Sequence, residues 1–273
     1  MRVTLAVLIV LIASLANAQK FDEVSARQDS AYQNLKGKIV NQFKNASPGQ
    51  FGSFVKGVDE DINTNNKVMA LTFDACGGPH GSGYDAELVN FLIKEKIPAT
   101  LFLSGLWIDA HIDKVRELSA NPLFEIENHG LTHHPCAING ESKYGIHGTV
   151  SVSQAVDEIE LNARKIEFMT TRKPLYYRSA TATTDEACTA IAKHLQETII
   201  SYDLLSGDAV AGTPTSVIKE NLVKGAKNGA IVIMHMNHPE WTGYEALKES
   251  VAEWQRAGFF FVKLEQHPLK GKY

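Results

Sequence analysis

The sequence has no large excess of charge, few cysteines and no long apolar run after its first residues. Its 273 residues carry a formal net charge of −4, so charge gives no reason to expect a nucleic-acid partner. With only three cysteines, at least one stays unpaired or pairs between chains in an oxidising compartment. The glycines at 77 and 78 are not followed by the Gly-Lys-Ser/Thr of a phosphate-binding loop, which excludes that motif. We find no internal repeat and no low-complexity tract.

The N-terminus predicts export. Arg2 precedes an apolar run over residues 3–13, and Ala16-Asn17-Ala18 then supplies the small residues of a cleavage site. The run is shorter than the roughly 20 residues that a membrane-spanning helix needs. We therefore predict a signal peptide over 1–18, a periplasmic or secreted protein, and no stable membrane insertion after cleavage. A membrane anchor or a buried N-terminal helix is the alternative.

The mature chain divides into a leader and one large domain. Residues 19–45 are polar and mostly helical in pattern, and residues 46–66 are rich in turn-forming residues. We predict an N-terminal helical leader and linker over 19–66 and a single large domain over 67–273. In that domain, short apolar runs alternate with segments of helical periodicity. The expected strands are 68–73, 99–103, 124–126, 175–178, 198–202, 230–234 and 259–263, and the expected helices are 85–97, 110–120, 152–169, 184–195, 214–227 and 242–256.

This alternation predicts an α/β fold with a parallel sheet covered by helices. About seven strands in succession favour a closed or nearly closed barrel over a doubly wound sheet. In such barrels the chemistry lies at the carboxyl ends of the strands, and polar residues do follow the apolar runs here: Asp74, His129, His133, Arg178, Asp203, Asp208 and His235. His129 and His133 could bind one zinc ion if the backbone between them makes a helical turn.

These motifs, in this order and spacing, resemble the polysaccharide deacetylase family (carbohydrate esterase family four, the NodB-homology fold). They are Thr72-Phe73-Asp74, His129-x-x-x-His133 followed by Pro135, then Arg178, and residues 231–234 followed by His235. The resemblance covers about residues 67–264. It implies a distorted (β/α) barrel and a divalent metal, with zinc as the expected ion. It also implies hydrolysis of N-acetyl groups on a polysaccharide such as peptidoglycan or a chitin-like polymer.

The resemblance also implies a role for each matched residue. His129 and His133 match the metal-binding pair, with Asp74 a further possible ligand. Asp74 matches the general base, Arg178 matches the arginine that orients it, and His235 matches the general acid. Asp208 matches the second aspartate of the family's Asp-x-x-Asp-Trp motif. The expected chemistry is attack of an activated water on the amide carbon, with Asp74 taking its proton and His235 protonating the leaving amine. A backbone N–H in the turn 76–78 would hold the oxyanion.

The sequence departs from the family pattern at four places. Where the family has a metal-binding aspartate, this chain has Ala75, and we weigh Asp85, Glu127, His80 and His134 as replacement ligands. The arginine motif continues as Ser179-Ala180-Thr181. Leu205 replaces the aspartate that tunes the acid histidine, with Asp203 as a substitute. Ala209 replaces the tryptophan of the sugar site, with Trp107 or Trp241 as alternative aromatic faces.

Two further readings of function stay open. The loss of the metal-binding aspartate at Ala75 fits a catalytically weak carbohydrate-binding protein on the same fold, although a binder has no need of the acid and the base. An O-acetyl esterase of the xylan type would differ only in substrate. The bonding of the cysteines also has two alternatives. Cys76 and Cys136 each lie near a motif and could form a disulfide, or they could be reduced packing residues.

Overall fold

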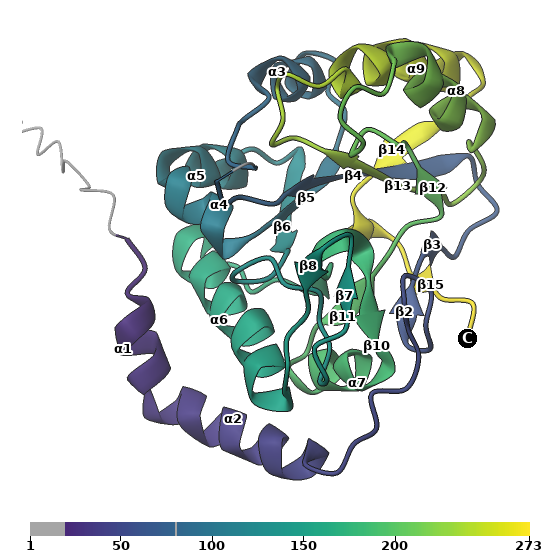
Figure 1. The fold of residues 1–273 in the computed structure, drawn as a ribbon. Coiled ribbons are helices and arrows are strands. Elements are labelled where there is room, and N and C mark those ends of the chain that lie inside the picture. The colour runs from purple at the N-terminus through teal and green to yellow at the C-terminus, as the bar shows by residue number, and fades with distance from the viewer. Residues whose placement is uncertain (1–19, 80) are drawn as a thin grey trace, which may run out of the picture.

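The centre of the fold is a nine-stranded sheet in which all paired strands are parallel. The computed structural model describes residues 20–79 and 81–273, so the predicted signal peptide lies outside the described residues. The strand order is β12-β13-β4-β5-β6-β9-β11-β2, with β14 beside the start of β4. Figure 1 shows the sheet curling, with helices around its outside.

All seven predicted strands are present. They are β4 (Val68–Ala75), β5 (Ala99–Leu103), β6 (Phe124–Asn128), β9 (Tyr176–Tyr177), β11 (Thr198–Ile200), β13 (Ile231–His235) and β14 (Phe260–Val262). Two strands that we did not predict, β2 (Val58–Asp59) and β12 (Leu204–Leu205), extend the two edges. The prediction of a distorted α/β barrel of parallel strands is therefore confirmed.

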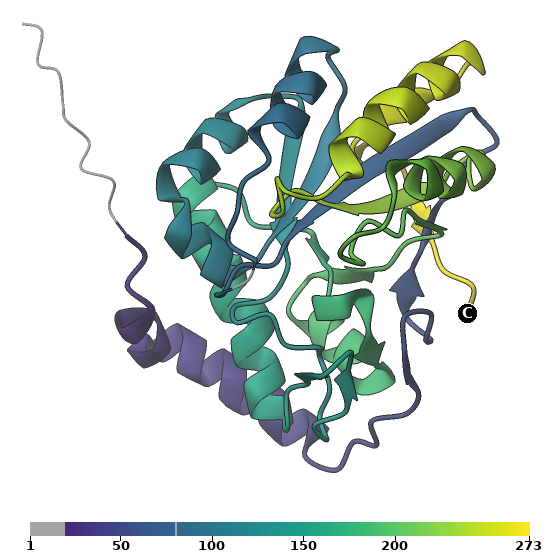
Figure 2. The ribbon, with the colours of Figure 1, turned by 45° about the horizontal axis from the view of Figure 1, so that its top comes forward.

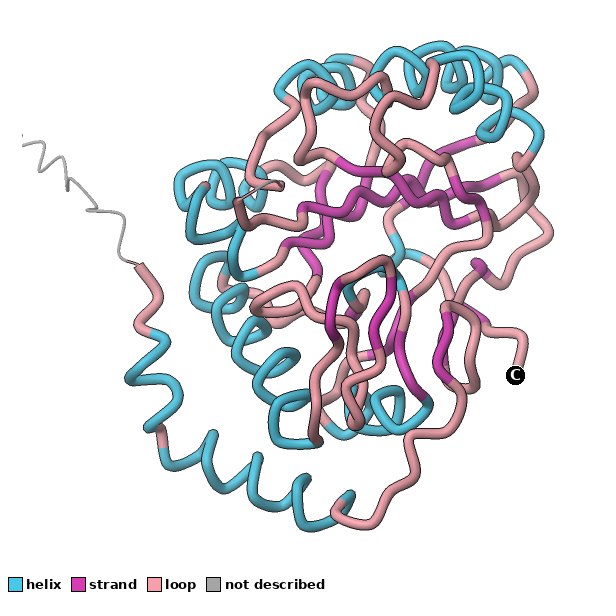
Figure 3. Tube along the Cα trace, in the orientation of Figure 1, coloured by secondary structure: helices cyan, strands magenta, loops and turns pink. Residues whose placement is uncertain are grey.

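The described part of the domain contains seven α-helices, and all but the second of them lie at predicted places. They are α3 (Ala86–Lys94), α4 (Gly105–Ala110), α5 (Ile112–Ala120), α6 (Val152–Thr170), α7 (Glu186–His194), α8 (Thr215–Lys224) and α9 (Gly243–Arg256). Figures 2 and 3 show them on the outside of the curled sheet. No helix in the described part of the chain has both the length and the hydropathy of a membrane span.

Side-chain alternation along β4 separates the hydrophobic core from the site. Met69, Leu71, Phe73 and Ala75 belong to the largest core cluster, which they share with residues of α3 and α9. Thr72 and Asp74 therefore point to the opposite face of the sheet, because successive side chains of a strand alternate between its faces. A smaller apolar cluster, which includes Ala70, lies on that inner face.

The segment before the sheet wraps around the domain. Helices α1 (Glu23–Gln28) and α2 (Ser30–Phe43) pack against α6, and α2 also reaches α7. Ile39 of α2 is buried in the cluster formed by α6 and α7, so the leader is part of the packed structure.

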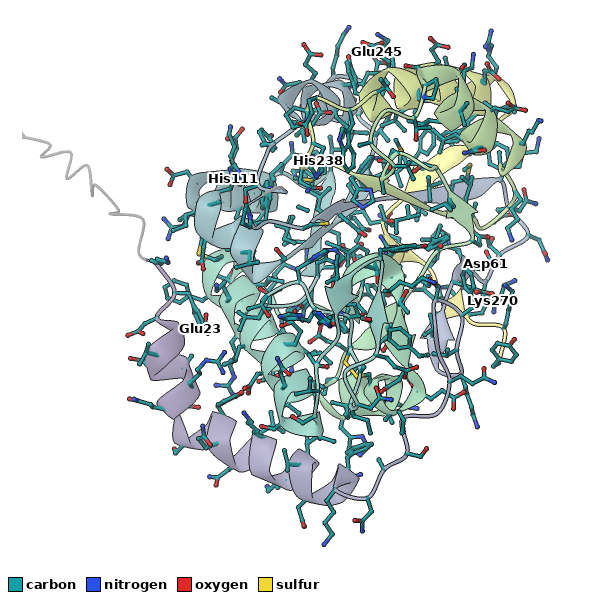
Figure 4. All side chains as sticks on the ribbon, viewed as in Figure 1. Glu23, Asp61, His111, His238, Glu245 and Lys270 are labelled. Carbon is teal, nitrogen blue, oxygen red and sulfur yellow. A yellow bond between two sulfur atoms is a disulfide. The ribbon has the colours of Figure 1, made fainter. Side chains whose placement is uncertain are left out.

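Short antiparallel pairs outside the main sheet join the remaining segments to one another. β1 (Phe51–Gly52) pairs with β10 (Thr184–Asp185), and β7 (Ser142–Lys143) pairs with β8 (Ile146–His147). Near the C-terminus, β15 (Leu269–Lys270) returns to β3 (Asp61–Ile62). Figure 4 labels Asp61 and Lys270, whose carboxylate oxygen and Nζ are 3.4 Å apart.

Candidate active site

Polar side chains from four strand ends meet at the carboxyl edge of the sheet. Asp74 lies near the end of β4, directly opposite His235 at the end of β13. His129 follows β6, and Arg178 follows β9. The parallel arrangement brings these residues together although they are up to 161 positions apart in the chain (from 74 to 235), as the fold class predicts.

A buried ion pair fixes Asp74. The guanidinium of Arg178 donates from Nη1 to Asp74 Oδ1 at 2.8 Å and to Thr72 Oγ1 at 2.7 Å, and from Nη2 to the Ser201 carbonyl at 2.8 Å. The same group lies 4.2 Å from the ring centre of Phe102. Burial alone would raise the pKa of Asp74, but Arg178 and the nearby histidines lower it below its ordinary value. The structure thus holds Asp74 as a carboxylate, and its Oδ2 is left facing His129 at 3.8 Å from Nε2.

The imidazole of His129 is oriented by a backbone carbonyl. Its Nδ1 is 2.7 Å from the carbonyl oxygen of Arg178, so Nδ1 carries a hydrogen and Nε2 is the nitrogen that faces the site. Gly130 follows with a φ of +83°, and a Cβ there would lie 2.4 Å from Glu158 Oε1. A glycine is therefore needed beside His129.

The loop that carries His133 is held by a buried carboxylate of α6. Glu158 accepts hydrogen bonds from the Thr132 N–H at 3.1 Å, the Thr132 hydroxyl at 2.6 Å and the His134 N–H at 3.0 Å. His133, between them, has a φ of +60°, a conformation that non-glycine residues adopt where surrounding contacts impose it. Sequence reasoning did not identify Glu158, because a glutamate within a helical pattern carries no signal of this role.

Cys76 lies among the histidines. Its Sγ is 3.8 Å from His129 Nε2, and the ligand atoms of Cys76, His129 and His133 all lie within 4.8 Å of one another. Among the described residues this is the group of histidine, cysteine and acidic side chains whose spacing suits a metal ion. Burial raises the pKa of the Cys76 thiol, but His133, His129 and His235 together hold it well below its usual range.

The donor atoms of this group fit a metal ion. His133 Nε2 is inaccessible to solvent and has no hydrogen-bond partner among the described residues, which is costly unless another group binds it. Two imidazoles and a sulfur are ligands that zinc prefers. Asp74 is not part of this group, so its predicted role as a ligand stays a prediction, as do those of His129 and His133.

His235 is paired with Asp208. The Asp208 carboxylate accepts the His235 backbone N–H at 2.7 Å, and Oδ1 lies 3.1 Å from His235 Nδ1. Burial lowers the pKa of His235, but Asp208 and then Cys76 raise it well above its ordinary value. Asp203 was a wrong candidate for this place: it pairs with Lys227 at 2.7 Å and accepts the Ile231 N–H, at the other end of β13.

The three described candidates for the third ligand, Asp85, Glu127 and His134, are bonded to other partners. Asp85 caps α3 by accepting the Leu88 N–H. Glu127 accepts the N–H groups of Leu175 and Tyr176, and the side chain of His134 is bonded to the His147 carbonyl. His80 lies outside the described residues.

The aromatic face beside the site belongs to Trp241. Trp107 is fully buried and donates from Nε1 to the Gly83 carbonyl. Trp241 stacks on His238, with ring centres 3.6 Å apart and planes 6° apart, and its ring centre is 6.0 Å from that of His235. His238, labelled in Figure 4, thus supports the tryptophan at the rim.

The cysteines pair differently from the arrangement that we considered. Cys136 forms a disulfide with Cys188 of α7, drawn as the yellow bond beside α7 in Figure 4, and Cys76 is free. A Cys76–Cys136 bond is therefore excluded in this structure. In the turn after Cys76, the Gly77 N–H donates to the Gly81 carbonyl, so the expected oxyanion donor of residues 76–78 stays a prediction for the other two N–H groups.

Comparison with known proteins identifies the fold and the family. A family model described as polysaccharide deacetylase matches residues 61–200. An uncharacterised protein of Bacillus subtilis strain 168, YlxY, is 22% identical over 61% of this chain, and the chain spans about half (48%) of that relative.

Solved structures of the same fold include both active and inactive proteins. A family-four pseudoenzyme from Bacillus anthracis, BA3943, superposes with a TM-score of 0.64 at 21% identity, over 76% of this chain and 67% of its own. The peptidoglycan N-acetylglucosamine deacetylase Bc1960 superposes with a TM-score of 0.64 at 19% identity, over 76% of this chain and 91% of its own. At these identities the structural likeness establishes the fold alone.

Proposed function

The chain belongs to the polysaccharide deacetylase family, and from that premise we propose that it hydrolyses N-acetyl groups of an amino-sugar polysaccharide, with peptidoglycan as the expected substrate. The observation that carries the proposal is the pair of buried dyads, Asp74 with Arg178 and His235 with Asp208. A base held ionised and an acid held protonated, on neighbouring strands, are what amide hydrolysis requires.

A divalent metal held by His129 and His133 would lower the pKa of a water molecule and polarise the acyl oxygen. Asp74 is placed to accept the proton of the attacking water, since Arg178 occupies Oδ1 and leaves Oδ2 toward the site. His235 donates a proton to the leaving nitrogen, because Asp208 stabilises its imidazolium form. The products are acetate and a free amino sugar.

Two partly exposed aromatic residues support a polysaccharide substrate. Trp241 lies on the side of β13. Tyr202 follows β11 and is half-buried against Phe54, with ring centres 5.4 Å apart. Aromatic rings present apolar faces with a polar edge, which suits stacking on sugar rings.

The test is acetate release by the purified protein from peptidoglycan, N-acetylated chito-oligosaccharides and acetylated xylan. We expect release from the N-acetyl polymers and its loss in His129→Ala. The matched control is His194→Ala, an exposed histidine on α7, which should retain the wild-type rate. Release from xylan alone would instead identify an O-acetyl esterase.

A second candidate function is sugar binding without catalysis. It is favoured by Ala75, which stands at the family's metal-binding aspartate, and it has a parallel in the BA3943 pseudoenzyme fold. Binding of the same polymers without acetate release, with zinc supplied, would support the binding protein and refute the enzyme.

A further inference from the structure

We propose that Cys76 is the third protein ligand of the metal, so that a Cys-His-His set with His129 and His133 replaces the family's carboxylate-containing set. The inference rests on the metal site of the proposed function and deepens it by naming the ligand that compensates for Ala75. It concerns metal binding, and can be tested apart from catalysis.

The course of β4 explains why the ligand is displaced by one residue. Ala75 is still within the strand, opposite Leu103 of β5, and its side chain is fully buried in the apolar cluster between the sheet and the helices. A ligand at 75 would point away from His129. The strand ends there, and Cys76 is the first residue whose side chain is free of the strand's alternation.

The turn that follows holds Cys76 in place. Gly77 has a φ of +77°, and a Cβ on it would lie 2.5 Å from the backbone nitrogen of Trp107, so this close approach to α4 requires glycine. The Cys76 carbonyl accepts the Ser104 hydroxyl at 2.5 Å, and the Ser104 N–H donates to the Ala75 carbonyl at 3.1 Å. Both residues before the turn are thereby anchored to the start of α4.

The three donor atoms are oriented toward one point. His129 Nδ1 is occupied by the Arg178 carbonyl, so Nε2 is the nitrogen that faces Sγ, at 3.8 Å. His133 Nε2 is buried without a hydrogen-bond partner among the described residues. Donors around a tetrahedral zinc lie roughly 3.3–3.7 Å apart, given its bond lengths. The three donor atoms here lie within 4.8 Å of one another, so only a small side-chain movement would bring them to the distances of a zinc site.

The chemistry of sulfur determines which metal the site would take. A thiolate is a soft ligand, and with two imidazoles it selects zinc over hard cations such as magnesium. Three protein ligands leave a fourth, open position, as in catalytic zinc sites. Cys76 is also the free cysteine of the three, because the other two form the disulfide.

The experiment uses cobalt as a spectroscopic probe. The purified full chain is stripped of metal with a chelator and titrated with Co²⁺, and the near-ultraviolet spectrum is recorded for the thiolate-to-cobalt charge-transfer band. We expect the band in the wild type and its absence in Cys76→Ser and Cys76→Asp. Zinc affinity should fall more than about tenfold in Cys76→Ser, because losing even an outer-shell partner costs about 10–100-fold. Cys76→Asp should retain much of the zinc affinity, since a carboxylate also binds zinc.

His129→Ala is the matched control for metal binding, and thermal unfolding of each variant shows that the fold is intact. Cobalt binding that depends on His129 but gives no thiolate band would overturn the proposal. So would zinc affinity unchanged in Cys76→Ser, or a chelator-treated protein that stays active with an acetylated Cys76 in its mass spectrum. That last result would make the thiol a nucleophile.

The two proposals fail in different ways. A thiolate band without acetate release supports the ligand assignment and refutes the deacetylase. Acetate release with cobalt bound and no thiolate band supports the deacetylase and refutes the ligand assignment.

Discussion

Reduction of the Cys136–Cys188 disulfide should destabilise the protein by about 4 kcal/mol. The bond closes a loop with a sequence separation of 52 residues, and the chain-entropy model assigns such a loop about 14 cal/mol/K, or about 4 kcal/mol at 25 °C. Both cysteines are fully buried in the cluster that joins α2, α6 and α7. Since domains are stable by roughly 5–15 kcal/mol, the reduced protein should fold but with a much smaller reserve.

The assay is urea unfolding at pH 7 with and without reductant, in a Cys76→Ser background to prevent thiol exchange. The double variant Cys136→Ser/Cys188→Ser should match the reduced protein to within about 1 kcal/mol and should not respond to reductant. A difference below about 1 kcal/mol between oxidised and reduced protein would refute the reasoning. It would mean that the segment after His133 is held by its non-covalent contacts without help from the disulfide.

Three further predictions follow from single contacts. Ala75→Asp restores the family residue but places a carboxylate in an apolar cluster. We expect it to lower the free energy of unfolding by at least about 2 kcal/mol in urea titrations. A variant with wild-type stability and tighter zinc binding would contradict this expectation. Asp208→Asn should reduce kcat for acetate release by about 10²–10⁴-fold with little change in KM, because His235 loses the carboxylate that stabilises its protonated form. Asp203→Asn is the control. Equal rates for the two variants would count against the pairing of His235 with Asp208. Burial raises the pKa of Asp185 to about 6, so the folded state favours its protonated form. Protonated Asp185 therefore adds to the free energy of unfolding below about pH 4, and this addition is lost as pH rises through 6. Asp185→Asn should therefore gain on the order of 1 kcal/mol relative to wild type between pH 4 and pH 8, and parallel stability curves would rule the effect out.

The sequence predicted the sheet well because β4, β5 and β13 are largely apolar runs and β6 alternates apolar with acidic residues. β4, β5, β6 and β13 are almost wholly buried, and their patterns are visible in the residues alone. β2 and β12 have two residues each, too few for any periodicity. Their places in the sheet depend on tertiary pairing, which single-sequence patterns do not contain.

The sequence predicted the residues at the strand ends but not the place of Cys76. Asp74, Arg178 and His235 meet because parallel strands align their carboxyl ends. The place of Cys76 depends on where β4 ends and on the turn at Gly77, and the direction of a side chain after a strand end cannot be read from spacing. For the same reason, spacing could not decide whether Asp203 or Asp208 pairs with His235. In the structure only Asp208 faces His235.

The pairing of β4 also has a consequence for how the protein assembles. This central strand is flanked by β13 and touches β14, whose residues come some 160 to 190 positions later in the chain. Closing such long loops is slow, and non-local pairing delays folding. The edge of the sheet that carries Asp74 and His235 therefore cannot form on a partly synthesised chain. A growing chain that has reached only residue 200 contains Asp74, His129 and His133 but not His235, and its strand β4 still lacks its neighbour β13.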